Sequence, residues 1–178
     1  MPVNHRFAVW LTGLPASGKS SIAAALKSKL EALGVPVEVL ESDALRRTLT
    51  PAPTYSHEER DLFYRAVAVM GSRLVAHGVT VLFDATANKR AYRNVARDLI
   101  PNFLEVAVEC PLETCMERDR KGTYRKGRAG ESATVPGLQD SYEPPLDPAL
   151  RIDTTRTGPE ASAELILSML RDRFPLTQ

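Results

Sequence analysis

The chain has 178 residues, of which 25% are charged, and its formal net charge is +1. A chain of this length folds by default as one domain, so we expect a single domain over residues 1–178. The balanced charge argues against a protein that binds nucleic acid or a membrane surface. The two cysteines, Cys110 and Cys115, are too few for a disulfide framework or a zinc site. With no visible signal peptide and no apolar run of membrane-spanning length, we expect a reduced, cytoplasmic protein.

The first apolar run, residues 7–12, leads into the segment GLPASGKSS at residues 13–21. This segment matches the P-loop pattern, in which backbone N–H groups converge on phosphate oxygens at a helix N-terminus. Lys19 is expected to reach the terminal phosphates, and the Ser20 hydroxyl to ligate Mg²⁺. A nucleoside triphosphate should therefore bind to Gly13, Leu14, Pro15, Ala16, Ser17, Gly18, Lys19, Ser20 and Ser21.

Short apolar runs alternate with apolar residues at helical spacing along the rest of the chain. The runs predict strands at residues 7–12, 37–40, 80–83, 103–108 and 150–153. Helices are predicted at residues 17–33, 56–76, 89–99 and from 157 onward, where apolar or amphipathic spacing is helical, and at 111–119, where Pro111 marks a helix start. Residues 44–49 are long enough for one or two helical turns. Ser56 and Glu59 have the spacing of a capping box at the start of the longest helix.

Residues 120–148 differ from the rest of the chain. They contain four glycines, four prolines and five basic residues, without sustained periodicity. No helix or strand is predicted there. A loop of this length inside a compact domain is usually either functional or disordered.

Strands that alternate with helices predict right-handed crossovers and a parallel sheet covered on both faces. We therefore expect an α/β fold of the P-loop NTPase type, with a parallel five-stranded sheet. Ligands of such sheets bind at the carboxyl ends of the strands. Gly13, the cluster Glu41-Ser42-Asp43 and Asp84 all fall at predicted strand ends. The P-loop and these carboxylates should therefore share one edge of the sheet.

Phosphoryl transfer needs a held phosphate, neutralised charge and an oriented acceptor hydroxyl. Asp43 is our candidate for orienting that hydroxyl; the alternative is that it caps the short helix at 44–49. Asp84 is our candidate for holding the water shell of Mg²⁺; the alternative is a polar strand end. The expected metal-site residues are thus Ser20, Asp43 and Asp84.

Arg46 and Arg60 flank the expected acceptor side of this edge. An arginine on a surface helix is usually solvated or weakly paired. Near an edge that must hold an anionic substrate, however, both become candidates for binding that substrate.

Several segments together resemble one known family, adenylyl-sulfate (APS) kinase. They are GLPASGKSS, LESDALRRTL, YSHEERDLFYRAVAVMG, PLETCMERDRKGTYRKGRAGE and DSYEPPLDP, in this order and over residues 7–153. The segment ERDRKGTYRKGRAGE is the most specific of them. The family transfers the γ-phosphate of ATP to the ribose 3′-hydroxyl of APS, which gives PAPS in sulfate assimilation.

The resemblance implies roles for matching residues. Asp43 matches an acid near the acceptor hydroxyl and the metal, and Arg118 matches an arginine that packs on the ATP adenine. Arg46 and Arg60 match arginines that hold APS, and Tyr55 matches one of two rings that clamp its adenine. Residues 120–148, with Lys126, match a basic lid that closes over both nucleotides and excludes water. The family often forms homodimers.

The chain also departs from the family pattern on the acceptor side. The family's D-G-D-N is Glu41-Ser42-Asp43-Ala44 here, and its F-I-S-P is replaced by residues 85–88, ATAN, after Asp84. The string DAT at a strand end resembles polynucleotide-kinase-like and zeta-toxin-like kinases. The second clamping ring aligns with Val135, and an asparagine that helps hold APS aligns with Phe63.

Three functions are therefore considered. The first is an ATP- and Mg²⁺-dependent kinase of APS, and the second a kinase of the same fold that phosphorylates another small anionic hydroxyl compound. The third is a nucleotide-binding regulator without turnover, which the joint presence of Lys19, Ser20, Asp43 and the basic lid disfavours.

Overall fold

A computed structural model describes residues 6–176 of the chain. Within them, one sheet has the strand order β2-β3-β1-β4-β5. The strands are β1 (Ala8–Thr12), β2 (Val37–Glu41), β3 (Thr80–Asp84), β4 (Phe103–Glu109) and β5 (Leu150–Asp153). Every neighbouring pair of these strands is parallel. The predicted parallel five-stranded sheet is confirmed.

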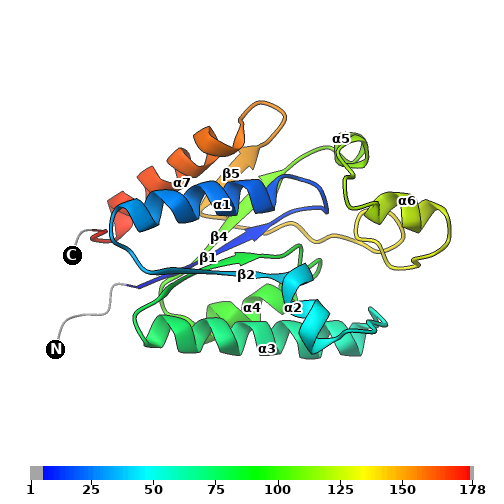
Figure 1. The fold of residues 1–178 in the computed structure, drawn as a ribbon, viewed down its shortest axis with the longest axis horizontal. Coiled ribbons are helices and arrows are strands. Elements are labelled where there is room, and N and C mark those ends of the chain that lie inside the picture. The colour runs from blue at the N-terminus through cyan, green and yellow to red at the C-terminus, as the bar shows by residue number, and fades with distance from the viewer. Residues whose placement is uncertain (1–5, 177–178) are drawn as a thin grey trace.

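The helices cover both faces of this sheet, as predicted. In Figure 1, α1 and α7 lie on one face, and α3 and α4 on the other. The helices are α1 (Lys19–Ala32), α2 (Ser42–Leu49), α3 (His57–Ala76), α4 (Arg90–Leu99), α5 (Leu112–Glu117), α6 (Thr123–Arg128) and α7 (Pro159–Arg173). None of the helices within residues 6–176 is long and apolar enough to cross a membrane.

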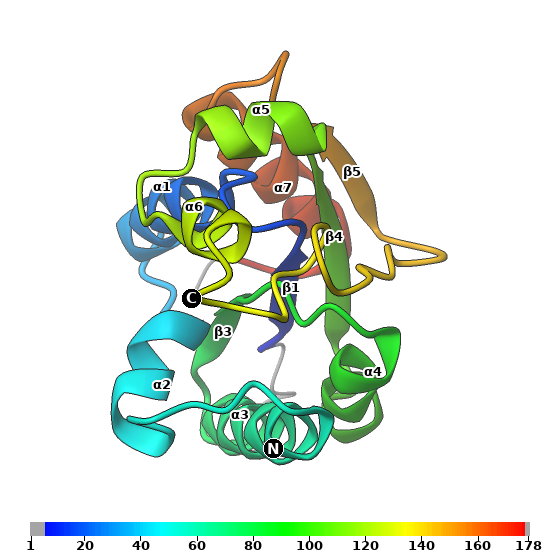
Figure 2. The same cartoon turned by 90° about the vertical axis from the view of Figure 1, so that its right-hand side faces the viewer.

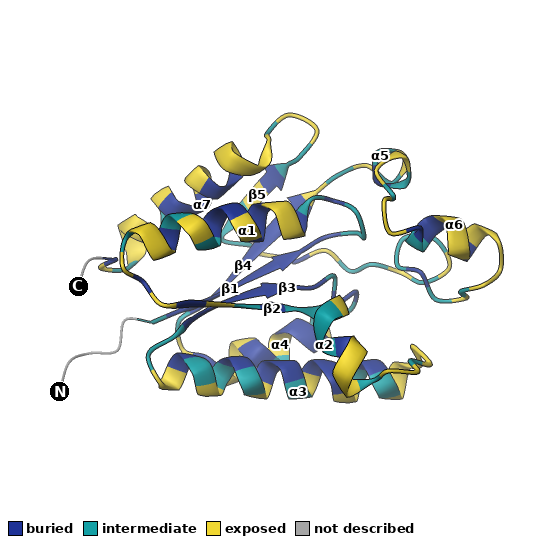
Figure 3. Cartoon of the chain, in the orientation of Figure 1, coloured by how far each residue is buried: buried dark blue, intermediate teal, exposed yellow. Residues whose placement is uncertain are grey.

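The central strand β1 is buried along its whole length, because helices cover both faces (Figure 3). Its side chains alternate between two apolar clusters. Val9 and Leu11 pack in the cluster beneath α1 and α7, whereas Ala8 and Trp10 pack in the cluster beneath α3 and α4. A strand buried on both faces appears in the sequence as a continuous apolar run, which explains the pattern at residues 7–12.

The strand register brings the carboxyl ends of β1, β2 and β3 to one edge. Asp84, the last residue of β3, lies opposite Leu11 of β1 and Glu41 of β2. Figure 2 looks onto this edge, with α5 and α6 in front of the strands. The P-loop, the 41–43 cluster and Asp84 therefore do share one edge, as expected from the topology.

The prediction that residues 120–148 contain no helix was wrong. The helix α6 lies within them, and the Asp119 carboxylate accepts hydrogen bonds from its first N–H groups, those of Thr123, Tyr124 and Arg125, at 2.8, 2.9 and 3.0 Å. Six residues are too few to show helical periodicity in the sequence. The helix depends on this side-chain cap and on packing.

The capping box predicted for α3 forms only in part. Ser56 is the N-cap, and its Oγ accepts a hydrogen bond from the Glu59 N–H at 3.1 Å. The Glu59 carboxylate, however, accepts hydrogen bonds from the N–H groups of Thr54 and Tyr55 and from Arg46. The start of the helix was therefore predicted correctly, but the Glu59 side chain binds Arg46 and the residues before the helix instead of closing the capping box.

Gly71 of α3 lies against the ring of Phe83, and a Cβ there would be 2.3 Å from the Phe83 Cζ. The Phe83 ring stacks on Trp10 at a centroid distance of 4.5 Å, so it cannot move away from an added Cβ without disturbing that packing. We predict that Gly71→Ala lowers the free energy of unfolding by about 1–3 kcal/mol. Urea denaturation would measure the loss. Val69→Ala is the control, because that side chain is 49% exposed and its loss should change the stability by less than about 0.5 kcal/mol. Equal midpoints for both variants would contradict the prediction.

Candidate active site

The P-loop joins β1 to α1 through a backbone that turns twice into the left-handed region. The φ angle is 61° at Ala16 and 107° at Gly18. The N-cap of α1 is Gly18, which has no side chain to cap the helix, and the first turn contains no acidic residue. Successive N–H groups in such a turn, at an uncapped helix N-terminus, form a site for an anion. The local geometry therefore suits the phosphates predicted from the sequence.

Lys19 is buried at this loop, and its Nζ donates hydrogen bonds to the carbonyls of Gly13 and Leu14 at 3.0 and 2.8 Å. Burial lowers the pKa of Lys19 from 10.5 to about 8, although the carboxylate of Asp84 acts to raise it. The loop carbonyls thus hold the ammonium group in place, although its burial disfavours the charged form. A bound anion would stabilise that charged form.

A cavity of about 1000 Å³ opens beside the P-loop. This volume lies at the upper end of the range for ligand pockets, so it can hold two small molecules. Of the residues predicted from the sequence, it is lined by Pro15, Ala16, Gly18, Lys19, Ser20, Ser21, Asp43, Arg46, Tyr55, Arg60, Asp84, Arg118 and Lys126.

Three predicted P-loop residues, Gly13, Leu14 and Ser17, are not among those that line the cavity. A Cβ on Gly13 would be 2.3 Å from the carbonyl oxygen of Val108 and 2.8 Å from the Ser17 Oγ. Glycine is thus required here by close packing of the loop on β4. Leu14 packs against the apolar cluster around Cys115.

Asp43 lies in the first turn of α2, which has Glu41 as its N-cap. The alternative that Asp43 caps this helix is therefore wrong. Its Oδ2 instead accepts a hydrogen bond from the Nζ of Lys121 at 2.6 Å, and Lys121 also lies 3.5 Å from the Glu41 Oε1. Lys121 comes from the segment 120–148, so this segment contacts both Asp43 and Glu41.

Asp84 is nearly buried, at 4% exposure, and lines the cavity with Ser20 and Asp43. These oxygen donors fit Mg²⁺, which prefers carboxylate and hydroxyl ligands. Among residues 6–176, no group of three or more His, Cys, Asp or Glu side chains could hold a metal by itself. A Mg²⁺ ion here would therefore depend on the nucleotide phosphates and on water for most of its ligands.

Arg46 is buried, at 7% exposure, and not solvated as a surface arginine would be. Its guanidinium lies over the rings of Phe63 and Tyr55, at 3.9 and 4.9 Å from the centroids. Its Nη1 also donates a hydrogen bond to the Glu59 Oε1 at 3.2 Å. The aromatic rings and the carboxylate together fix this cation at the cavity wall.

Arg60 is also buried, at 5% exposure. Its Nη1 donates hydrogen bonds to the Oδ2 of Asp140 at 2.6 Å and to the Oδ1 of Asn88 at 3.3 Å. Its Nη2 donates to the carbonyl of Thr134 at 2.6 Å. Arg60 therefore joins α3, the turn after β3 and the segment 120–148.

Arg118 lies on the P-loop side of the cavity, apart from Arg46 and Arg60. It donates hydrogen bonds to the Oγ1 and the carbonyl of Thr154, both at 3.1 Å, and the Thr154 Oγ1 donates to the carbonyl of Ser17 at 2.8 Å. The helix α6, which carries Lys126, is tied to the P-loop by a hydrogen bond of 2.9 Å from Tyr124 Oη to the Pro15 carbonyl.

The partners of these side chains are not predictable from the sequence pattern. Glu59 was recognised only as a capping residue, and Asn88 only as a departure from the family pattern. Lys121 and Asp140 lie in the segment without periodicity, where no local pattern indicates which side chains meet the cavity. Arg60 and Asp140 are 80 positions apart in the sequence, and Asp43 and Lys121 are 78 positions apart.

The lowered pKa of Lys19 predicts that a nucleoside triphosphate binds with uptake of a proton. At pH 8.5, above the pKa of about 8, most Lys19 side chains are neutral, and the charge of the triphosphate raises that pKa again. We expect roughly half a proton or more to be taken up per site, and the affinity to fall as the pH rises further. Calorimetric titrations in buffers of different ionisation enthalpy would measure the uptake.

Lys27→Met supplies the control for this measurement, because Lys27 pairs with Glu31 on α1 and does not line the cavity. It should retain the proton uptake of the native chain. Binding heats at pH 8.5 that do not depend on the buffer would contradict the prediction.

Comparisons with known proteins identify relatives along nearly the whole chain. The family model described as adenylylsulphate kinase matches residues 5–153. An adenylyl-sulfate kinase of Synechococcus sp. (strain JA-3-3Ab) is 40% identical, over 92% of this chain and 93% of that protein.

Two solved structures are also similar. The Mycobacterium tuberculosis APS kinase, in complex with AMPPNP and APS, has a TM-score of 0.87 and 33% identity, and the match covers 93% of this chain and 98% of that chain. A hexameric APS kinase from Thiobacillus denitrificans has a TM-score of 0.70 and 27% identity, with coverage of 97% and 30%. The family model, the close relatives and the shared fold agree with the P-loop and the cavity described above, and this chain belongs to the adenylyl-sulfate kinase family.

Proposed function

We propose that this protein transfers the γ-phosphate of ATP to the 3′-hydroxyl of APS and releases PAPS and ADP. The observation that carries the proposal is a single cavity whose wall includes the P-loop, Asp43 and the buried arginines Arg46 and Arg60. Such a cavity can hold a phosphate donor and an anionic acceptor together, with a carboxylate in the same wall.

ATP occupies the side of the cavity next to α1. Its phosphates bind the N–H groups of the P-loop and the Lys19 ammonium, and its adenine packs on Arg118. Ser20, with Asp43 and Asp84 nearby, would hold Mg²⁺, which would supply neutralisation of the charge that develops on the phosphates. The proton uptake predicted for Lys19 belongs to this step.

APS occupies the opposite side. Arg46 and Arg60 bind its phosphate and sulfate groups, Tyr55 packs on its adenine, and Asp43 orients its 3′-hydroxyl toward the γ-phosphate. Tyr55 is suited to this role because it is 37% exposed at the cavity, next to the Arg46 guanidinium.

We further propose that residues 120–148 act as a lid on a single domain that spans the chain; residues 1–5 and 177–178 lie outside the described part. Closure brings Lys126 toward the bound nucleotides and excludes water, which limits wasteful hydrolysis of ATP. Lys121, whose ammonium group pairs with Asp43, would then exchange this carboxylate for the phosphates, which leaves Asp43 to meet the acceptor.

The proposed function is tested by incubating the protein with ATP, Mg²⁺ and APS, and following ADP release and PAPS formation. Turnover should require all three compounds. If APS is inert while another phosphorylated or sulfonated hydroxyl compound is turned over, the acceptor is wrong and the kinase assignment stands. Tight ATP binding without any turnover would support the regulatory alternative.

The role of Asp43 predicts a selective loss of turnover. Asp43→Asn should lower kcat by about 10²-fold or more, because the carboxylate acts only during transfer. The affinity for ATP should change by less than about three-fold, since the P-loop remains intact. Asp61→Asn is the matched control, because Asp61 is an exposed acid that pairs with Arg65 on α3. If Asp43→Asn leaves kcat unchanged, Asp43 has no part in the reaction.

A different acceptor remains the second candidate, and Val135 favours it. Val135 is 3% exposed and packs with Cys115 of α5 and Tyr124 of α6. An adenine in the acceptor pocket therefore has Tyr55 as its aromatic partner, and the loss of one stacked ring costs roughly 1–3 kcal/mol of affinity. A smaller anionic hydroxyl compound would not need that second ring, and the same ADP assay on a panel of such compounds decides the matter.

A homodimer and a cytoplasmic location are also part of the proposal, from the family resemblance and the composition. Because one similar solved APS kinase is described as hexameric, the assembly state needs a direct measurement. Sedimentation of the purified chain at micromolar concentration would distinguish a dimer from a monomer or a hexamer.

A further inference from the structure

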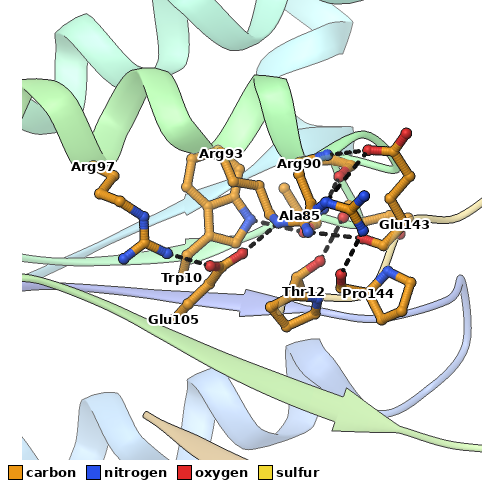
Figure 4. Close-up of polar contacts among 12 residues, drawn as sticks. Trp10, Thr12, Ala85, Arg90, Arg93, Arg97, Glu105, Glu143 and Pro144 are labelled. Carbon is orange, nitrogen blue, oxygen red and sulfur yellow. Dashed lines mark hydrogen bonds and ion pairs between the residues drawn. The ribbon is translucent and has the colours of Figure 1, made fainter. Parts of the chain in front are cut away.

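Arg93 is a fully buried cation on α4 that the proposed reaction does not yet use. Its exposure is 0%, and its Nε pairs with Glu105, which lies in β4 at 6% exposure. Figure 4 shows that this pair also includes Arg97, from the next turn of α4. Burying such charges is costly, and apolar side chains of the same size often stabilise a core equally well. The other contacts of Arg93 therefore need an explanation.

The remaining donors of Arg93 bind two backbone carbonyls outside the sheet. The Nη1 donates to the carbonyl of Ala87 at 2.5 Å, and the Nη2 to the carbonyl of Glu143 at 2.7 Å (Figure 4). Ala87 belongs to the turn after β3, residues 85–88, and Glu143 to the end of the proposed lid. We refer to residues 140–145 as the return segment. The planar guanidinium donates to the three partners from three separate nitrogen atoms, and the single Nζ of a lysine cannot span that arrangement.

The turn that Arg93 holds is strained and also braced from other sides. Ala87 has a φ of 42°, in the left-handed region that is unfavourable for alanine. A residue in that region keeps its conformation only where its surroundings hold it there. Trp10 Nε1 donates a hydrogen bond to the Ala85 carbonyl at 3.0 Å, and Thr12 Oγ1 donates to the Thr86 carbonyl at 2.7 Å. Trp10 and Thr12 thus bind the first two carbonyls of the turn, and Arg93 donates to the third, that of Ala87.

The two segments that Arg93 holds meet at Asn88. The Glu143 N–H donates a hydrogen bond to the Asn88 carbonyl at 2.7 Å, and the Asn88 Nδ2 donates to the Ser141 carbonyl at 2.8 Å and to the Asp140 Oδ2 at 3.2 Å. Asn88 and Asp140 are also the side chains that accept hydrogen bonds from the Arg60 guanidinium. A continuous set of contacts therefore runs from Arg93 to Arg60.

We propose that Arg93 is a positioning residue for the acceptor pocket. Arg93 binds the carbonyls of Ala87 and Glu143 and thereby holds the 85–88 turn and the return segment in place. In this arrangement, Asn88 and Asp140 orient Arg60 toward the anionic group of the acceptor. The inference rests on the proposed function, because it assigns Arg60 to acceptor binding. It also names a specificity element on the acceptor side, since this set reaches the cavity wall through Asn88 and Arg60 and includes none of the residues assigned to ATP.

Two lysine substitutions form a matched test. Arg93→Lys and Arg97→Lys both keep a cation beside Glu105, but only the first removes the hydrogen bonds to Ala87 and Glu143. We expect Arg93→Lys to raise the KM for APS about ten-fold or more and to leave the KM for ATP within about two-fold. Arg97→Lys should leave both KM values within about two-fold of the native chain. A parallel rise of both KM values for Arg93→Lys, or no change in either, would overturn the proposal.

A second variant decides the matter if Arg93→Lys does not fold. Asn88→Ala removes the side chain that links the 85–88 turn to Arg60 and to the return segment. The Arg60 charge keeps its pairing with Asp140. It should raise the KM for APS about five-fold or more and leave the KM for ATP unchanged. An unchanged KM for APS would overturn the proposal.

Hydrogen exchange on the ligand-free protein separates this inference from the proposed function. In Arg93→Lys, or in Asn88→Ala, amides of the 85–88 turn and the return segment, above all that of Glu143, should exchange faster, with the P-loop and α1 unchanged. Arg97→Lys should exchange like the native chain. If the native chain does not phosphorylate APS, the proposed function fails, and unchanged exchange at these two segments still refutes the role of Arg93.

Discussion

The parallel pairing of β1, β2 and β3 is the constraint on which the rest of the site depends. Its register sets Leu11 opposite Asp84 and Asp84 opposite Glu41, so the three strands end at one edge. The P-loop continues from β1 and α2 from β2, which brings Lys19 and Asp43 into one cavity wall. A slip of β3 by one residue would turn Asp84 to the other face of the sheet. The site would then lose the carboxylate that partly offsets the burial of Lys19.

The charged groups around the cavity are largely paired within the chain. Lys19 binds two carbonyls of its own loop, Lys121 pairs with Asp43, and Arg60 pairs with Asp140. These pairings reduce the cost of keeping ionised groups in a partly buried site. They also require each ligand to replace an internal partner. A ligand with few negative charges would gain little from this exchange, so the arrangement favours strongly anionic ligands such as the proposed ATP and APS.

Local patterns predicted the fold well where an element is long or buried on both faces. The run at residues 80–83 and the helical spacing along α3 each correspond to an element within one residue or so of the predicted bounds. The same reasoning failed for α6, because six residues leave no period to detect and because the Asp119 cap lies outside the helix. It was incomplete for Glu59, whose capping pattern was genuine but whose carboxylate binds Arg46, 13 positions away.

By itself, the sequence determined the class of fold, the P-loop and the family, because each depends on residues that are close together in the chain or on a repeated alternation of apolar runs. Only the tertiary structure decided which polar side chains are buried. Arg60 and Arg93 lie on helices whose sequences are typical of surface helices, yet both are buried. The partners that make this burial possible are distant in the sequence. Asn88 and Asp140 lie 28 and 80 positions from Arg60, and Glu105 and Glu143 lie 12 and 50 positions from Arg93. A charge can be buried only where such partners converge, and that convergence is a property of the packed sheet and not of any local segment.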